Sequence, residues 1–287
     1  MGRELLFQHY LVAFLDILGQ RESLRKLTAL PTNAEEKTKF ITHIKQSYGK
    51  VKRIRNYFKD YLDASDSYNT NVNLVAPKHH KQFLDSQKFE VSFHGFSDSI
   101  LIYVPLMSND ENCTAMNGVY STFVATSGIG LFALSDKIPI RGGLDVGIAT
   151  EIGEREIYGP VLERALDLEH IAEYPRFLIG NELLNYLTLV ENQEYTSPLG
   201  ENARQVARFC KEMIIRDTDG RYMLDFLGPK LREMAGNPIE RETVITAFNF
   251  VKEEYNKYTQ QDNEKLMSRY LRLLNYFQLQ QDVWELS

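Results

Sequence analysis

The amino-acid sequence predicts an α/β (α+β) fold with a C-terminal extension that is mainly α-helical. Three observations lead to this prediction. The apolar run at residues 10–15 is typical of a buried strand. Two shorter β-like runs, at 91–96 and 100–104, flank a polar tip and indicate a hairpin. From residue 240 onward the pattern is largely helical.

Composition narrows the class of protein. Of the 287 residues, 43% are hydrophobic and 25% are charged, a balance that excludes wholesale disorder and collagen-like repeats. A net charge of −6 gives no general electrostatic reason to expect nucleic-acid binding. Cys113 and Cys210 match neither a disulfide framework nor a zinc-finger spacing. We therefore expect no nucleic-acid partner and a reducing compartment.

The sequence also bears on localisation and domain organisation. We find no stretch that reaches the roughly 20 apolar residues of a spanning helix. The N-terminus lacks the basic and apolar regions of a secretory signal. We expect a cytoplasmic protein without membrane contact. Residues 1–190 are predicted to form one domain, with 191–287 as an extension packed on it.

The other elements follow from periodicity and turn signals, taken in chain order. We predict helices at 21–30 and 33–64, a loop at 65–88, an apolar helix with a glycine-containing break at 110–135, a strand at 138–149, a short strand leading into a helix at 155–169, a strand at 177–179 and a helix at 203–215. Residues 217–220 resemble the start of a calcium loop, but their strand-like flanks favour a hairpin turn.

Two aspartates are positioned for chemistry. Asp16 ends the buried strand and precedes a glycine turn, while Asp98 lies at the tip of the predicted hairpin. If those strands are neighbours, the carboxylates converge and can hold two divalent cations. The N–H groups after Asp16 would then cradle a polyphosphate. The alternative, that each aspartate caps a helix or fills a turn, stays open because spacing alone does not decide it.

The order of four segments supports the interpretation that the two aspartates converge and bind divalent cations. These are Phe-Leu-Asp-Ile-Leu-Gly at 14–19, Phe-Ser-Asp-Ser-Ile at 96–100, Arg-Gly-Gly-Leu-Asp-Val-Gly-Ile at 141–148 and Tyr-Gly-Pro-Val-Leu-Glu-Arg-Ala-Leu-Asp-Leu-Glu at 158–169. Over roughly residues 8–182 the chain resembles the catalytic core of class III nucleotidyl cyclases. The resemblance implies a central, mostly antiparallel sheet with flanking helices.

Departures from the purine cyclases point to a subgroup. The purine-selecting position is His94, and the second base-contact position falls on Glu156. The usual Asn and Arg of the last helix fall on Glu163 and Asp167. The chain is more similar to the pyrimidine cyclases of bacterial antiphage (Pycsar) systems. They share its Phe-Leu-Asp-Ile-Leu-Gly opening, its Phe-Ser-Asp-Ser hairpin, a Gly-Pro helix start and the Tyr-Pro-Arg at 174–176.

This resemblance implies a homodimer with two Mn²⁺ or Mg²⁺ ions per active site. It would convert UTP or CTP to the 3′,5′-cyclic monophosphate and pyrophosphate, and a separate effector would read the product during phage infection. The implied metal-binding residues are Asp16, Ile17 and Asp98. The implied substrate-binding residues are Phe14, Ile17, Leu18, Gly19, His94, Glu156 and Arg176. Metal aspartates would come from one subunit and base-contacting residues from its partner.

A positive side chain must also meet the charge that develops on the phosphate. Arg164, Arg176 and Arg141 are the candidates, in that order, and Arg164 is our predicted catalytic arginine. We favour UTP over CTP because uridylate cyclases are commoner in the resembling group. A purine cyclase and a non-catalytic nucleotide-binding module remain as alternatives.

Overall fold

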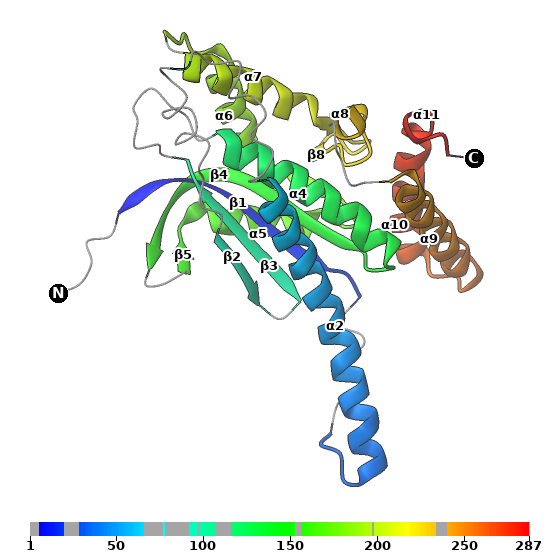
Figure 1. Cartoon of the computed structure of the whole chain (residues 1–287). Helices are drawn as coiled ribbons and strands as arrows, with labels where there is room; N and C mark the ends of the chain where they lie inside the picture. Colours follow the sequence, from blue (N-terminus) through cyan, green and yellow to red (C-terminus); the bar gives the residue numbers. More distant parts are fainter. Residues whose placement is uncertain are drawn as a thin grey trace, which may run out of the picture.

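The structure is a computed structural model that describes residues 6–19, 29–65, 77, 92–96, 98–106, 116–152, 156–196, 198–233 and 240–286. Most of the predicted helix at 21–30, most of the predicted loop at 65–88, and Cys113 lie outside these ranges. The described residues form one central sheet with helices on both faces (Figure 1).

The central sheet confirms the predicted fold class. Within the described residues it has the strand order β2-β3-β1-β4-β6-β8-β7, with β5 paired to β4. The strands are β1 (Phe7–Ile17), β2 (Ser92–Phe96), β3 (Ser99–Pro105), β4 (Ile140–Ile152), β5 (Glu156–Tyr158), β6 (Phe177–Ile179), β7 (Ile214–Arg216) and β8 (Tyr222–Leu224). The pairing of β4 with β6 is parallel and the other pairings are antiparallel.

Strand β1 lies in the middle of the sheet and is covered on both faces. Leu11, Ala13 and Leu15 belong to the larger core, whereas Tyr10 and Val12 belong to a smaller core on the opposite face. Because successive side chains alternate between two buried faces, the strand reads as one continuous apolar run. The predicted buried strand is therefore confirmed.

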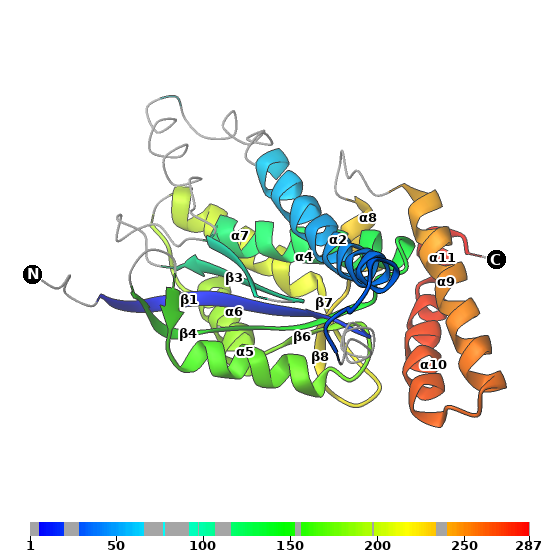
Figure 2. The ribbon, with the colours of Figure 1, turned by 90° about the horizontal axis from the view of Figure 1, so that it is seen from below.

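Helices cover the sheet unevenly. They are α2 (Ala34–Ser65), α4 (Met116–Ser135), α5 (Pro160–Ile171), α6 (Asn181–Asn192), α7 (Pro198–Glu212), α8 (Pro229–Glu233), α9 (Arg241–Gln260), α10 (Glu264–Leu279) and α11 (Gln281–Trp284). Helix α5 packs on one face, over β4 and β1, while α2, α4 and α7 lie on the other (Figure 2). Helices α9 and α10 pack together at one end of the sheet.

Helix α4 bears on two predictions: that no stretch is long and apolar enough to span a membrane, and that a glycine-containing break interrupts this helix. Its length and composition would suffice to span a membrane, although 83% of its most apolar 18-residue window is buried within the fold. It is apolar all round because it packs against α2, α7 and α9. The predicted break at its glycines is also wrong, because the helix is continuous. A Cβ at Gly130 would lie 2.6 Å from the Phe177 ring, so this glycine permits close packing.

The C-terminal extension contributes to the sheet as well as packing on it. Strands β8 and β7 continue the sheet beyond β6, and residue 190 lies inside α6. The predicted hairpin turn at 217–220 is confirmed: the Gly220 N–H donates to the Asp217 carbonyl at 2.9 Å. Gly220 has a φ of 84°, in the left-handed region that favours glycine.

Candidate functional site

Asp16 and Asp98 lie at the same edge of the sheet. Asp16 is next to last in β1, where its neighbours are Ser99 on β3 and Arg141 on β4. Asp98 directly precedes Ser99, and its backbone carbonyl accepts a hydrogen bond from the Ile17 N–H at 3.3 Å. The strand pairing therefore brings together two aspartates that are far apart in the sequence.

The Asp16 carboxylate is 6% exposed. The Ser99 hydroxyl donates to its Oδ1 at 3.0 Å, and the Arg141 guanidinium is 4.0 Å from its Oδ2. Burial raises the pKa of Asp16 to about 6, with additional upward contributions from the Glu169 and Asp98 carboxylates. A bound cation would stabilise the ionised form of this carboxylate.

Arg141 is held mainly by Glu169. Its Nε lies 2.6 Å from Glu169 Oε1, much closer than its contact with Asp16. Glu169 is 2% exposed and belongs to the buried stripe of α5, together with Val161 and Ala165. Sequence reasoning ranked Arg141 last and missed Glu169. An acid on the apolar stripe of a helix was the signal that could have identified it.

Phe14 and His94 share a sheet face with Asp16. Cross-strand partners point to the same side, and Leu101 pairs with both Phe14 and His94. The His94 and Tyr103 rings are stacked, with centroids 5.7 Å apart and an interplanar angle of 19°. Phe14 and Leu101 are only partly buried. Beside the carboxylates the sheet therefore presents a row of flat and apolar side chains.

The chain stays beside the sheet through Leu18 and then turns at Gly19. The Leu18 N–H donates to the Pro139 carbonyl at 2.9 Å, and Gly19 adopts a φ of 85°. An L side chain at Gly19 would be strained there, which is why a glycine suits this turn. The predicted polyphosphate cradle at the start of the next helix lies outside the described residues.

Arg164 and Glu156 are not beside the aspartates of the same chain. The Arg164 Nε is 2.7 Å from Oδ2 of the buried Asp145, and its guanidinium also donates to the Val146 carbonyl at 2.7 Å. Asp145 lies four residues along β4 from Arg141. Glu156 is exposed on β5, which pairs with the opposite end of β4. Within one chain, neither side chain contacts Asp16 or Asp98.

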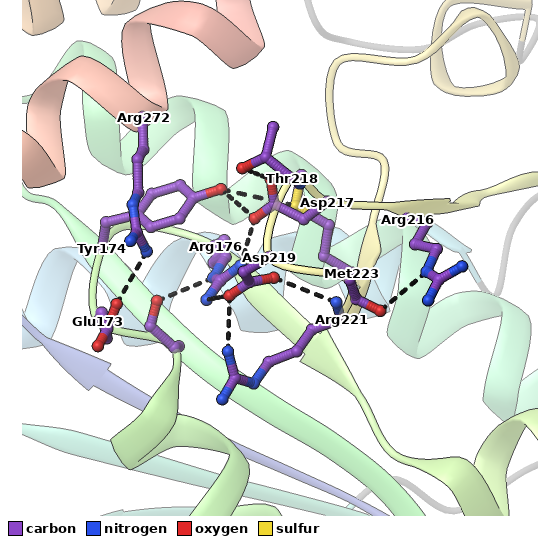
Figure 3. Close-up of polar contacts among 12 residues, drawn as sticks. Glu173, Tyr174, Arg176, Arg216, Asp217, Thr218, Asp219, Arg221, Met223 and Arg272 are labelled. Carbon is purple, nitrogen blue, oxygen red and sulfur yellow. Dashed lines mark hydrogen bonds and ion pairs between the residues drawn. The ribbon is translucent and has the colours of Figure 1, made fainter.

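Arg176, which the sequence analysis predicts to bind substrate, lies in the interior of the fold. Its side chain is 0% exposed and forms ion pairs with Asp217 and Asp219 of the turn between β7 and β8 (Figure 3). Its Nε donates to the Ala172 carbonyl at 2.8 Å, and its guanidinium lies 4.5 Å from the Tyr174 ring centroid. These partners occupy the guanidinium, so Arg176 has a structural role.

The donor set at Asp16 and Asp98 is small. Among the residues that the structure describes, no group of three or more His, Cys, Asp or Glu side chains could hold a metal ion. Two carboxylates still suit Mg²⁺ or Mn²⁺, because Mg²⁺ usually keeps several waters and binds through one or two carboxylates plus substrate phosphates.

Comparison with known proteins gives weak similarities. No protein-family model matches the sequence, and no curated protein matches it. One solved structure of a bacterial light-regulated adenylyl cyclase is 14% identical, with a TM-score of 0.37, covering 63% of this chain and 46% of that one. A second is 13% identical, with a TM-score of 0.38, covering 71% of this chain and 98% of that one. The chain thus spans less than half of the first, and similarity at this level carries no argument about function.

Proposed function

We propose that this protein is a nucleotidyl cyclase that converts UTP to 3′,5′-cyclic UMP and pyrophosphate. The observation that supports this most is the convergence of Asp16 and Asp98 at one sheet edge, beside the partly buried Phe14 and Leu101. A carboxylate pair next to a flat, apolar surface suits a ligand that has phosphates at one end and a base at the other.

The carboxylates fit hard divalent cations. Asp16 is buried, and its neighbouring carboxylates raise its pKa, so a cation would relieve unfavourable charge. Asp16, Asp98 and Ile17 would hold two Mn²⁺ or Mg²⁺ ions. When bound, such ions lower the pKa of the ribose 3′-hydroxyl and neutralise charge on the leaving pyrophosphate.

The chain's own residues would position the reactants. Ser99 orients the Asp16 carboxylate through its hydroxyl, and Glu169 holds Arg141 behind it. The triphosphate and ribose would lie beside Asp16, Asp98 and Phe14 of one copy, and the base would lie toward the base-contacting residues of the other. The ribose O3′ forms a bond to the α-phosphorus while the bond to the bridging oxygen of the β-phosphate breaks. Pyrophosphate leaves, and the 3′-hydroxyl proton passes to solvent.

The motif resemblance is the basis for our proposals on the base, the homodimer and the biological role. His94 in place of a purine-selecting Lys or Glu favours a pyrimidine, and CTP is the nearest alternative to UTP. We propose that two copies assemble so that Glu156 and His94 of one copy serve the metal site of the other. The exposed Phe7, Ile148 and Tyr158 near Glu156 suit such an interface. We further propose a cytoplasmic enzyme, without nucleic-acid or membrane partners, whose product activates a separate antiphage effector.

A non-catalytic nucleotide-binding module is the second candidate. It is favoured by the pairing of Arg164 with Asp145, which occupies the predicted catalytic arginine. A purine cyclase is the third, and the residue at position 94 counts against it.

Product analysis tests these proposals. Purified protein would be incubated with ATP, GTP, CTP or UTP in Mn²⁺, and the products identified by mass spectrometry. We expect cyclic UMP from the wild type, none from Asp16→Ala or Asp98→Ala, and normal turnover from Asp282→Ala, which alters an exposed aspartate on α11. A cyclic purine would overturn the base assignment. Absence of any product would favour the non-catalytic module.

A further inference from the structure

The proposed substrate carries a triphosphate, yet the predicted arginines are already paired. Arg164 binds Asp145, Arg176 binds Asp217 and Asp219, and Arg141 binds Glu169. Phosphate groups are usually bound by cationic side chains and N–H donors. The three arginines that sequence reasoning favoured therefore leave the β- and γ-phosphates without an assigned cationic side chain.

A second group of cations lies on one face of α10. Lys265, Ser268, Arg269 and Arg272 follow the i, i+3, i+4, i+7 spacing that aligns side chains along a helix. With Glu173 and Tyr174 they line a cavity of about 250 Å³. Three cations against the one Glu173 carboxylate leave a net charge of +2 in this α10 pocket. Drug-sized ligands usually occupy about 300–1,000 Å³, so the volume suits part of a nucleotide.

The α10 pocket is close to the carboxylate edge. Arg141, which lies 4.0 Å from Asp16, also donates to the His170 carbonyl at 3.5 Å. The pocket residue Glu173 follows His170 by three positions, just beyond the end of α5. Burial, and then the positive charge of Arg141, lower the pKa of Arg269.

Arg269 is a cation of the pocket that has no polar partner within the described part of the chain. It is half-buried, and within the described part of the chain it makes no hydrogen bond and no ion pair. Arg272 differs, because its guanidinium lies 2.8 Å from the Glu173 carboxylate. A phosphate oxygen would supply the Arg269 guanidinium with a charge-assisted hydrogen bond. Lys265 and Ser268 are exposed beside it and offer further donors.

The opposite wall of the pocket is anchored. Glu173 adopts a φ of 61°, an uncommon conformation for a residue other than glycine. The next residue, Tyr174, donates its hydroxyl to Asp217, and Arg176 binds the same carboxylate (Figure 3). This buried network fixes the backbone that faces α10, so the cavity is formed before any ligand arrives.

We propose that Lys265, Ser268, Arg269 and Arg272 form a polyphosphate site that binds the β- and γ-phosphates of the nucleotide and then the released pyrophosphate. The identity of the ligand rests on the proposed cyclase function. The site would give the C-terminal extension a direct part in substrate binding, with Arg269 as the central contact.

Pyrophosphate binding tests the site separately from catalysis. Isothermal titration of the full chain with pyrophosphate, in a chelator that removes divalent cations, reports the α10 pocket without the metal site. We expect Arg269→Ala to weaken binding at least tenfold and Arg269→Lys to weaken it less. Arg208→Ala, which removes a 60% exposed cation on α7, should leave the affinity unchanged. Equal affinity for the wild type and Arg269→Ala would overturn the proposal.

Turnover separates this proposal from the proposed function. If the wild type makes a cyclic nucleotide, Arg269→Ala should raise KM for UTP at least tenfold. Active wild type with an unchanged KM and pyrophosphate affinity in this variant would remove the pocket and keep the cyclase. Arg269-dependent pyrophosphate binding in a protein that turns over no nucleotide would keep the pocket and remove the cyclase. Lys265→Ala, on an exposed side chain, provides a second variant if Arg269→Ala fails to fold.

Discussion

The molecule carries two pairs of aspartates near strand ends, and their surroundings differ. Asp217 and Asp219, between β7 and β8, face the buried Arg176 and form ion pairs with it. Asp16 lies near the end of β1, and Asp98 lies between β2 and β3. The nearest cation of Asp16 is Arg141, at 4.0 Å. Hydrogen bonding from Arg176 lowers the pKa of Asp219, whereas burial raises the pKa of Asp16 to about 6.

This difference separates a structural pair of carboxylates from the pair that we propose binds metal ions. Buried charges in proteins are normally paired or bind metals. The Asp217 pair is neutralised within the fold, and it joins the extension to the loop after α5. The arginine beside Asp16 is instead held by Glu169. Four substitutions test the contrast, and we give them in order of expected effect.

The largest effect is expected from Arg176→Met. Methionine keeps much of the volume but leaves the partly buried Asp217 carboxylate without its cation, whereas Asp219 keeps Arg221 at 2.7 Å. We expect a loss of about 3–5 kcal/mol in the free energy of unfolding. The corresponding fall in Tm is roughly 10 °C for a chain of this size. Thermal unfolding measures it, with Arg216→Ala in the same hairpin as control, since Arg216 is exposed. A fall no larger than that of the control would contradict a structural role for Arg176.

Asp16→Asn should act in the opposite direction and depend on pH. The folded pKa of about 6 exceeds the ordinary aspartate pKa of 3.8, so the wild type loses stability as pH rises through this window. Above pH 6 the variant should be more stable than the metal-free wild type by up to about 3 kcal/mol. Below the unfolded pKa this advantage should disappear. Urea unfolding in chelator at pH 4 and pH 7.5 checks this, and the same difference at both pH values would refute it.

Glu169→Gln should weaken metal binding at Asp16. Loss of the 2.6 Å ion pair frees Arg141 to move toward Asp16, where it competes with a divalent cation. We expect Mn²⁺ affinity to fall about tenfold, or about 1.4 kcal/mol. Titration with Mn²⁺ measures the change, and Glu163→Gln on the exposed side of α5 is the matched control. Unchanged affinity would mean that Glu169 does not position Arg141.

Tyr174→Phe should have the smallest effect. It removes the hydroxyl that donates to Asp217 while the ion pairs of Arg176 remain. We expect a loss of about 1 kcal/mol in the free energy of unfolding. Urea denaturation resolves this, with Tyr158→Phe as control because Tyr158 is 70% exposed. A loss as large as that of Arg176→Met would place the main anchor at the tyrosine hydroxyl.

Local patterns predicted the strands and the neighbourhood of the two aspartates. A buried strand reads as an apolar run, and the motif order put Asp98 beside the end of β1. The partners of the arginines could not be predicted in this way. Arg176 meets Asp217 across 41 positions of sequence, a pairing that only the placement of β8 beside β6 creates. In the sequence, an arginine that will bind a substrate looks the same as one that will be buried in an ion pair.

The α10 pocket could be predicted from the sequence only in part. Its Lys-x-x-Ser-Arg-x-x-Arg pattern is visible in the sequence and marks one basic face of a helix. The sequence analysis predicts only that this region is largely helical and belongs to an extension packed on the first domain. What the pattern could not reveal is that α10 lies against the loop after α5, next to Arg141.

The central position of β1 has a consequence for biosynthesis. This strand leaves the ribosome before its neighbours β3 and β4, which end only at Pro105 and Ile152. At about 5–20 residues per second, roughly 7–30 s pass before β4 is available to pair with it. During that interval the nascent chain exposes an apolar strand with two unpaired edges, which is a template for aggregation. Production of active protein should therefore depend on chaperone capacity and on the speed of translation through the first half of the chain.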